Sequence, residues 1–244
     1  MRSRGGPRPR GRGHRLLFAA GHSLGEFVAL AFAGATEPMA TLRVVVERGA
    51  AMHDAGEENP GTMTALVGIS PAEAEEIVRV AGRGDVLTVA NENSPKQTVV
   101  SGTIPAIERV EDLVRSRGAK AVRLKVAGAF HSSLMQPAAG RVRKAISALD
   151  FRQPRFPVVA NASGRPTDQP SALRDLLGRH IVSPVKWERS MKAMADEGVD
   201  LFLEAGPGDV LTKLAKRCVP GARAISVGSP QDVKTVIDEI GEGS

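Results

Sequence analysis

Apolar and polar residues alternate along this chain in two rhythms, one typical of strands and one typical of helices. Residues 16–20 form a short apolar run, as expected of a buried strand, and residues 26–33 form a mostly apolar stretch with the length of a helix. Residues 39–53 have the pattern of a second helix. The succession of both kinds of segment predicts an α/β fold class.

Between residues 61 and 126 the pattern predicts a small subdomain. Six segments are expected there in the order strand, helix, strand, strand, helix, strand: residues 63–68, 71–80, 86–90, 97–102, 104–116 and 121–126. Ser70 stands where the first helix needs its N-cap. The order βαββαβ is that of a ferredoxin-like domain. We therefore expect residues 16–60 and 127–244 to form one α/β body into which residues 61–126 are inserted.

The junction between the first predicted strand and helix contains a candidate nucleophile. Residues 21–25 read Gly-His-Ser-Leu-Gly, the pattern of a nucleophile elbow in which a tight strand-to-helix turn exposes the serine hydroxyl. Gly21 and Gly25 are expected where the turn leaves little room for a Cβ. Ser23 would lie at a helix N-terminus, whose free N–H groups stabilise an oxyanion, with the Leu24 N–H as the first donor. The alternative explanation is that this pattern occurs by chance in a chain with 26 glycines, but the flanking strand and helix favour a catalytic serine.

A serine nucleophile needs a base, and the chain has five histidines. Three are set aside because they lie in a polar tail, beside the serine and after a charge-rich helix: His14, His22 and His53. Two remain, His131 and His180. His131 follows the strand-like residues 121–127, and loop positions at strand ends are where catalytic groups gather. A lone histidine is more often structural than catalytic, so the pattern alone leaves this choice open.

The wider segment 21–27 resembles the active-site sequence of malonyl-CoA:acyl carrier protein transacylases and of the acyltransferase domains of polyketide and fatty acid synthases. Further motifs of that family recur here in the same order, at residues 46–49, 91–95, 128–132, 183–187 and 204–211. The resemblance extends from about residue 20 to about residue 218. Several ordered motifs over that length make coincidence implausible.

The resemblance implies a serine-hydrolase-like α/β body with the ferredoxin-like subdomain inserted, and it implies roles in catalysis. Ser23 would carry the acyl group, and His131 would be the general base that takes the Ser23 proton and later activates the acceptor thiol. The backbone carbonyl of His180 would orient His131. The His180 imidazole is expected to have no chemical part.

The resemblance also implies how the acyl group is bound. Arg48 would hold the free carboxylate of a malonyl group through a bidentate pair, whereas on an ordinary surface helix it would pair with Glu47 or another neighbour. Phe130 would favour malonyl over methylmalonyl by filling the space of the extra methyl, a preference of roughly 1–3 kcal/mol. Asn91 and Asn93, in an expected loop before Pro95, would either form a turn or make a polar contact with the acyl group or with the loop of His131.

The implied reaction is ping-pong transfer of malonyl from coenzyme A to Ser23 and then to the phosphopantetheine thiol of acyl carrier protein, in support of fatty acid synthesis. The coenzyme A thioester is then a substrate, and no metal or redox cofactor is expected. Carrier proteins are acidic as a rule, so basic residues near the site would help capture them: Lys186, Lys192 and Lys213. Two other functions stay open, a serine ester or thioester hydrolase and a carrier-protein-binding module without catalysis.

The net charge of +6 is concentrated at one end of the chain. Residues 1–15 hold six arginines and no acid, which leaves 27 basic and 27 acidic groups in the rest. Such a tail is expected to be disordered. Tyrosine is absent and Trp187 is the one tryptophan, which argues against a nucleic-acid partner. No run of eighteen apolar residues predicts a membrane span, and the single Cys218 excludes an internal disulfide. We expect a cytoplasmic monomer.

The segment ahead of the elbow departs from the family pattern. Family members carry a long segment there, with the sequence Phe-Pro-Gly-Gln-Gly-Ser-Gln near its start, whereas twenty-two residues precede Ser23 here. That segment would supply a second oxyanion donor, a first central strand and helices beside the sheet. The expectation is an N-terminally truncated transacylase whose oxyanion hole has lost one donor, a loss that typically lowers the rate by roughly 10²–10³.

Overall fold

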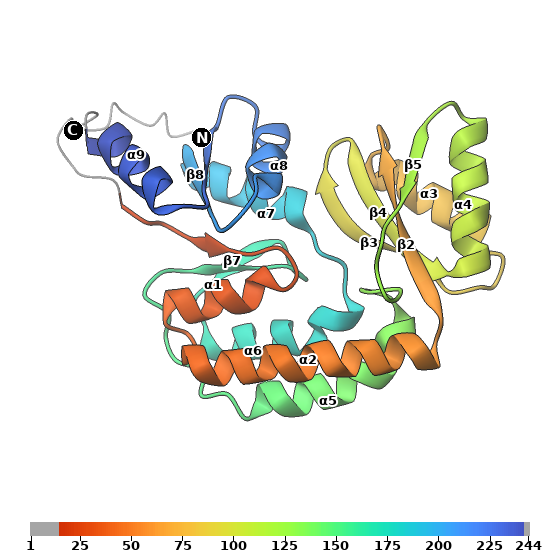
Figure 1. Cartoon of the computed structure of the whole chain (residues 1–244), viewed down its shortest axis with the longest axis horizontal. Helices are drawn as coiled ribbons and strands as arrows, with labels where there is room; N and C mark the ends of the chain where they lie inside the picture. Colours follow the sequence, from red (N-terminus) through yellow and green to blue (C-terminus); the bar gives the residue numbers. More distant parts are fainter. Residues whose placement is uncertain (1–14, 242–244) are drawn as a thin grey trace, which may run out of the picture.

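The computed structural model describes residues 15–241, which form an α/β body with a smaller subdomain at one end (Figure 1). The first part of the body consists of β1 (Ala19–Ala20), α1 (Gly25–Ala33), α2 (Pro38–Glu58), η1 (Ser133–Met135), α5 (Gln136–Ser147), β6 (Val158–Ala160), β7 (Arg165–Thr167), α6 (Pro170–Arg179) and η2 (His180–Val182). The second part consists of α7 (Trp187–Asp196), β8 (Leu201–Ala205), α8 (Val210–Cys218), β9 (Arg223–Val227) and α9 (Pro230–Gly241). Apart from Arg15, the arginine-rich tail lies outside the described residues.

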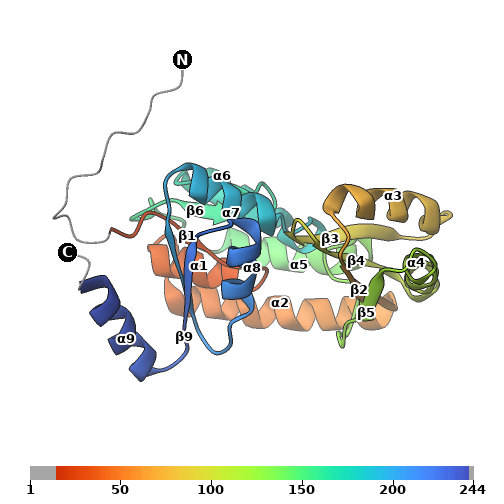
Figure 2. The same cartoon turned by 90° about the horizontal axis from the view of Figure 1, so that it is seen from above.

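The inserted subdomain has the expected element order. It contains β2 (Gly61–Val67), α3 (Pro71–Gly82), β3 (Leu87–Ser94), β4 (Gln97–Thr103), α4 (Ile104–Ser116) and β5 (Lys120–Arg123). The antiparallel sheet has the order β3-β4-β2-β5, and α3 and α4 cover one of its faces. Ser70 and Glu73 form a capping box that begins α3. The predicted ferredoxin-like βαββαβ arrangement is therefore present (Figure 2).

Two details of the subdomain differ from the expectation. β3 continues to Ser94, so Asn91 and Asn93 lie in a strand and not in a loop. The β3–β4 register shifts twice along this stretch, and such bulges redirect side chains. β3 can extend because its end pairs with the body, where the Val185 N–H donates to the Ala90 carbonyl at 2.8 Å. The second difference is that β5 ends at Arg123, whereas the predicted strand continued to residue 126. His131 is therefore not at the end of this strand.

The body is organised around β6, whose two faces contribute to different cores. Helices α1, α2, α5 and α6 pack on one side, where Phe27, Leu30, Met135 and Val158 are fully buried. On the other side, α7 and α8 bury Val159. β1 runs parallel to β6, with Ala19 opposite Val158, so the carboxyl ends of these two strands lie side by side. This arrangement brings the segments that follow β1 and β6 together.

Within residues 15–241 the body contains two separate sheets, β1-β6-β7 and β8-β9. An apolar cavity of about 420 Å³ lies between β1 and β8, and its lining includes Phe18, Ala20, Trp187, Leu201 and Leu203. The predicted strand 16–20 is reduced to two residues. The reason is visible in the pairing: residues 16–18 line this cavity and are not part of the β1–β6 ladder. No helix in the described part of the chain is long and apolar enough to cross a membrane.

Candidate active site

The turn between β1 and α1 has the geometry of a nucleophile elbow. Ser23 has a φ of 49°, a left-handed conformation that is rare for residues other than glycine. A Cβ on Gly21 would lie 1.9 Å from the Gly25 carbonyl oxygen, so this position requires glycine. The same argument is wrong for Gly25, where a Cβ would meet open space. Leu24 is the N-cap of α1, and its N–H therefore has no acceptor within the helix.

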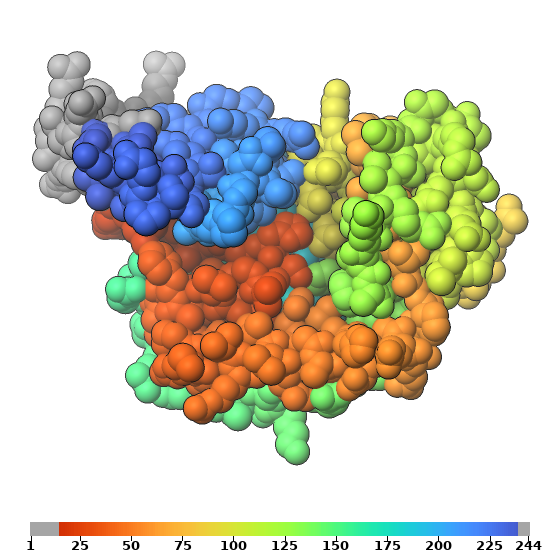
Figure 3. Space-filling model, viewed as in Figure 1, coloured from red at the N-terminus to blue at the C-terminus, as the bar shows by residue number. Residues whose placement is uncertain are grey.

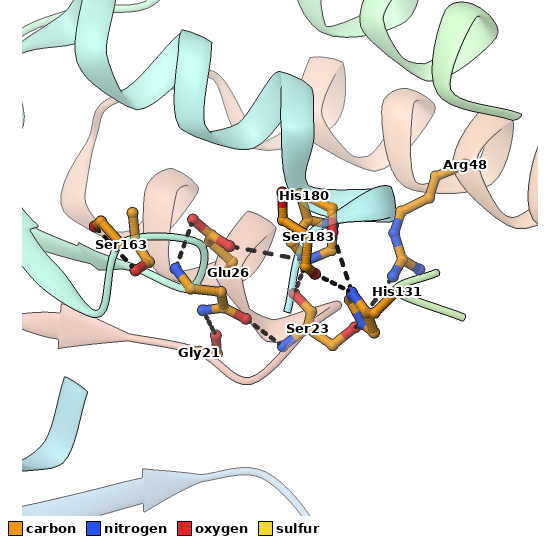
Figure 4. Close-up of polar contacts among 10 residues, drawn as sticks. Gly21, Ser23, Glu26, Arg48, His131, Ser163, His180 and Ser183 are labelled. Carbon is orange, nitrogen blue, oxygen red and sulfur yellow. Dashed lines mark hydrogen bonds and ion pairs between the residues drawn. The ribbon is translucent and has the colours of Figure 1, made fainter. Parts of the chain in front are cut away.

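Ser23 and His131 form a hydrogen-bonded pair. The Ser23 hydroxyl donates to His131 Nε2 at 2.9 Å, and His131 Nδ1 donates to two carbonyls, those of His180 and Ser183, each at 3.0 Å. Figure 4 shows both carbonyls converging on the ring. The expected His180 carbonyl is in place, and the Ser183 carbonyl was not foreseen. Donation from Nδ1 leaves the Nε2 lone pair free to accept the serine proton.

The electrostatics keep His131 neutral. The ring is buried, and burial, together with the positive charge of Arg48, lowers the pKa of His131 to about 4. The imidazole is therefore unprotonated at neutral pH, as a general base must be. Like Ser23, His131 has a positive φ, 59°. Besides these two, one other non-glycine residue in the described part of the chain has a positive φ, Arg83. Backbone strain of this type gathers at functional sites.

Arg48 approaches the same hydroxyl from α2. Its Nη2 donates to Ser23 Oγ at 3.2 Å, and its Nε is buried without a hydrogen-bond partner among the described residues. The surface-helix alternative is wrong, because Arg48 is 8% exposed and Glu47 pairs with Arg141 instead. Burial lowers the pKa of Arg48 to about 10, so the guanidinium stays charged at neutral pH. A charged guanidinium group with an unpartnered donor, placed beside a nucleophile, is suited to bind a carboxylate.

Asn161 holds the elbow from β6, and sequence reasoning missed it. Its Nδ2 donates to the Gly21 carbonyl and its Oδ1 accepts from the Ser23 N–H, both at 2.7 Å. Its own N–H donates to Glu26 Oε1 at 3.3 Å. The signal in the sequence is a polar residue directly after an apolar strand, but the pairing of that strand with β1 had to be known for Asn161 to stand out.

The His180 imidazole, for which no part was expected, also lies within the site. Its Nε2 donates to the Ser23 carbonyl at 3.1 Å and is 3.8 Å from Glu26 Oε2. The ring contacts His131 and Phe27 edge-on. His180 and Glu26 are both fully or almost fully buried, so these contacts are shielded from water.

Phe130 and Asn93 lie at the boundary with the subdomain. Phe130 is partly buried and packs against both the body core and the apolar cluster around Met63 and Val99. Asn93 Oδ1 accepts from His22 Nε2 at 2.8 Å, so it contacts the residue before the nucleophile and not the His131 loop. The space-filling view shows a recess where the segment around the elbow faces the subdomain (Figure 3). Across residues 15–241 no group of three or more His, Cys, Asp or Glu side chains could hold a metal ion.

Comparisons with known proteins agree with this geometry. Residues 10–236 match the family described as the acyl transferase domain. The chain is 35% identical over 227 residues to the malonyl CoA-acyl carrier protein transacylase of Bacillus subtilis, which covers 92% of this chain and 72% of that protein. The crystal structure of the acyl-carrier-protein-S-malonyltransferase from Bartonella henselae superposes with a TM-score of 0.88 at 34% identity, over 93% of this chain and 73% of that one.

A second solved structure adds a partner to this comparison. It is a malonyl-transacylase in complex with its type II polyketide synthase acyl-carrier protein, and it matches with a TM-score of 0.88 at 34% identity, over 93% of this chain and 74% of that chain. The family match over residues 10–236 includes the elbow, the inserted subdomain and the strands β1 and β6. This chain belongs to the acyl transferase domain family.

Proposed function

We propose that this chain transfers a malonyl group from coenzyme A to the phosphopantetheine thiol of acyl carrier protein through an acyl-enzyme on Ser23. The relatives named above support this proposal, since they carry that activity in their names and the two solved structures each align with 93% of this chain. The reaction uses the coenzyme A thioester as a substrate and calls for no metal or redox cofactor.

The observation that carries the proposal is the contact between Arg48 and Ser23. The guanidinium lies 3.2 Å from the attacking oxygen and keeps a buried donor, Nε, unpartnered. A carboxylate bound there must lie close to the carbonyl that Ser23 attacks. A malonyl group has this length, with one methylene between its carboxylate and its thioester carbonyl. An acetyl group leaves the buried donors of Arg48 unpaired, and sites built around such a polar contact discriminate by on the order of 10⁴.

The first half of the reaction forms the acyl-enzyme. His131 Nε2 accepts the hydroxyl proton while Ser23 Oγ bonds to the thioester carbon, and the resulting oxyanion is stabilised by the Leu24 N–H at the start of α1. When this adduct collapses, the carbon–sulfur bond breaks and His131 returns the proton to the sulfur of coenzyme A. Malonyl-Ser23 and free coenzyme A are the products.

The second half reverses these roles. The carrier protein's thiol gives its proton to His131, and its sulfur attacks the ester carbon of malonyl-Ser23. The Ser23 oxygen leaves and recovers the proton from His131. Throughout, the two carbonyls on Nδ1 hold the ring in one orientation and stabilise the imidazolium that forms in each half.

The proposal is tested by weighing the intact protein after incubation with malonyl-CoA or with acetyl-CoA. A malonyl adduct is expected on the wild type and not on Ser23→Ala. Arg48→Ala should slow malonylation by about 100-fold or more, because the carboxylate loses its charged partner. Arg43→Ala is the matched control, since Arg43 is an exposed arginine on the same helix and should react like the wild type.

Two results would contradict the proposal in favour of other functions. Equal release of free malonate and free acetate, without transfer to the carrier protein, would indicate an ester or thioester hydrolase. A folded chain that binds the carrier protein and forms no adduct would indicate a binding module.

The carrier protein is proposed to approach across basic residues, and the chain to act as a monomer in the cytoplasm. Of the three candidates, Lys192 pairs with Glu188, and Lys213 lies 2.7 Å from Asp209. Both lysines are more than half exposed, and ion pairs at such positions contribute little energy, so the lysines stay available. Charge reversal of Lys186, Lys192 and Lys213 together should raise the KM for carrier protein and leave malonylation by malonyl-CoA unchanged. An unchanged KM would exclude this surface.

A further inference from the structure

His180 contacts both members of the Ser23–His131 pair. Its ring contacts the Ser23 backbone, and its ring and its backbone carbonyl both contact the His131 ring. Its carbonyl accepts from His131 Nδ1, and its Nε2 donates to the Ser23 carbonyl, which lies 157 positions away in the sequence. The two imidazole rings meet edge-on, with centroids 5.3 Å apart and planes at 82°. One buried side chain therefore contacts the backbone of the nucleophile and the ring of the base (Figure 4).

Glu26 completes this arrangement from the first turn of α1. Its side chain is 3% exposed, and its Oε2 lies 3.8 Å from His180 Nε2. Glu26 Oε2 and His180 Nδ1 are both buried with no hydrogen-bond partner among the described residues. Charges in such surroundings are costly, so the uncharged forms are favoured. Burial accordingly raises the pKa of Glu26 to about 8 and lowers that of His180 well below its ordinary value.

We propose that His180 and Glu26 are positioning residues for acyl transfer, in which the His180 ring holds the Ser23 carbonyl and the His131 ring in place and the Glu26 carboxyl group packs against the His180 ring. This inference rests on the proposed function. The Ser23 carbonyl already accepts the Glu26 N–H at 3.0 Å within the turn, and the His180 N–H adds a second donor from a different element. A residue held at a positive φ needs such support, because its own conformational preference opposes it.

The uncharged state of Glu26 matters for Arg48. The charged or titratable groups that face the Glu26–His180 pair are Arg48 on α2, His131 and His22, so Arg48 supplies the positive charge of the site. A negative Glu26 would offset that charge and weaken the hold on a substrate carboxylate. An uncharged Glu26 leaves Arg48 to the substrate.

The role of His180 is tested by removing its ring while keeping its backbone carbonyl. His180→Leu loses the N–H to Ser23, whereas His180→Gln keeps an N–H on a side chain of similar reach. We expect kcat/KM for malonylation to fall by about 10- to 100-fold in His180→Leu, since small displacements of reacting groups have effects of this size, and to stay within about threefold in His180→Gln. Rapid-quench mass spectrometry of the wild type and both variants measures these rates.

Ile181→Ala separates positioning from stability. Ile181 follows His180 in the same 3₁₀ turn and is buried in the body core. Its truncation should lower Tm at least as much as His180→Leu, because it leaves a cavity, and keep kcat/KM of the folded protein within about twofold. A loss of activity in Ile181→Ala equal to that in His180→Leu would overturn the positioning role.

Glu26→Gln gives a readout that a purely structural role would not move. As the pH rises through about 8, Glu26 loses its proton, so kcat/KM of the wild type should fall, while the isosteric amide should keep it flat to about pH 9. An alkaline fall of the same size in Glu26→Gln, or wild-type rates in His180→Leu, would overturn the inference. If the wild type forms no malonyl adduct, the proposed function is contradicted. That result differs from those that overturn the positioning role, in which the wild type is active.

Discussion

At the scale of single residues, the pKa values of the site are set mainly by burial of the titratable side chains. His131, His180 and Glu26 all have a pKa displaced toward the uncharged form, and desolvation is the largest cause in each case. Arg48 is the exception, since a guanidinium remains protonated even when its pKa falls to about 10. The result is one positive charge among neutral hydrogen-bonding groups, a field suited to a substrate with one carboxylate close to its thioester.

The acid limb of the pH profile follows from the lowered pKa of His131. Its protonation removes the lone pair that accepts the Ser23 proton, so kcat/KM for malonylation should stay level down to about pH 5 and fall around pH 4. Arg48 contributes to that lowering, and a bound carboxylate neutralises Arg48. The acid limb of kcat should therefore lie at higher pH than that of kcat/KM. Rates measured with circular dichroism at each pH check this, and an acid limb of kcat/KM near 6.5 would contradict it.

At the scale of secondary-structure elements, the site depends on which strands are neighbours. The elbow follows β1, and the residue that holds it follows β6, so the parallel β1–β6 pair places Asn161 beneath Ser23. α1 supplies Leu24 and Glu26 in one turn, and the 3₁₀ turn η2 brings the His180 carbonyl to His131. The bulged end of β3 carries Asn93 to His22.

Asn161→Ala should separate the elbow from β6. The variant loses two hydrogen bonds to the turn, leaves the Gly21 carbonyl and the Ser23 N–H without their partners, and should lower the free energy of unfolding by about 2–4 kcal/mol. Malonylation of the folded variant should slow by about 10-fold or more, because the Ser23 conformation is no longer held. Ser163→Ala, which alters a side chain just beyond the strand, serves as the control for denaturation and rate measurements. Equal rates in the two variants would exclude a role for Asn161.

The sequence predicted the subdomain more completely than the body, and the reason is the range of the interactions. The helix from Ile104 to Ser116 and the Ser70 capping box are encoded within a few residues of chain. β1 is reduced to two residues because a strand also needs a partner, which local pattern does not supply. Asn91 and Asn93 were expected in a loop because the partner that extends β3, Val185, is more than ninety positions away.

At the scale of the whole molecule, stability is expected to be uneven. The subdomain buries Leu66, Val100 and Ile107 completely between its four-stranded sheet and the helices that cover it. In the two-stranded β8–β9 sheet, Leu203 remains 48% exposed beside the apolar cavity. Two-stranded sheets depend on what packs against them, so β8–β9 is expected to open more readily than β2–β4.

Hydrogen exchange measures this difference. Amides of β8 and β9 should exchange at least about 10-fold faster than those of β2 and β4, because they open in local fluctuations that leave the subdomain folded. The comparison is internal to one sample, so it needs no variant. Equal protection of the two sheets would mean that the chain opens only as a single unit and would contradict the expectation.

An exposed apolar surface runs along α1 and α2 and gives a second prediction for the whole molecule. Its six residues are at least 46% exposed: Leu24, Val28, Phe32, Met39, Leu42 and Val46. Apolar side chains exposed together on neighbouring helices bind hydrophobic dyes and lower solubility. Val28→Lys with Phe32→Lys should reduce dye fluorescence and leave Tm within about 2 °C, since exposed substitutions have small effects on stability. Val67→Lys, on the subdomain, is the control, and undiminished fluorescence in the double variant would contradict this.

The sequence by itself determined the order of the elements and the elbow at Ser23, because helix caps, periodicity and motif spacing are properties of short stretches of chain. Its resemblance to a known family singled out His131 and Arg48. Tertiary structure decided the rest. The Ser183 carbonyl, the Asn161 contacts, the His180 ring and the raised pKa of Glu26 all depend on residues far apart in sequence and on exclusion of water from the space between them. Burial and long-range contacts arise only when the chain is folded. Hydrogen-bond partners and pKa values are therefore determined by the tertiary structure and not by any local sequence pattern.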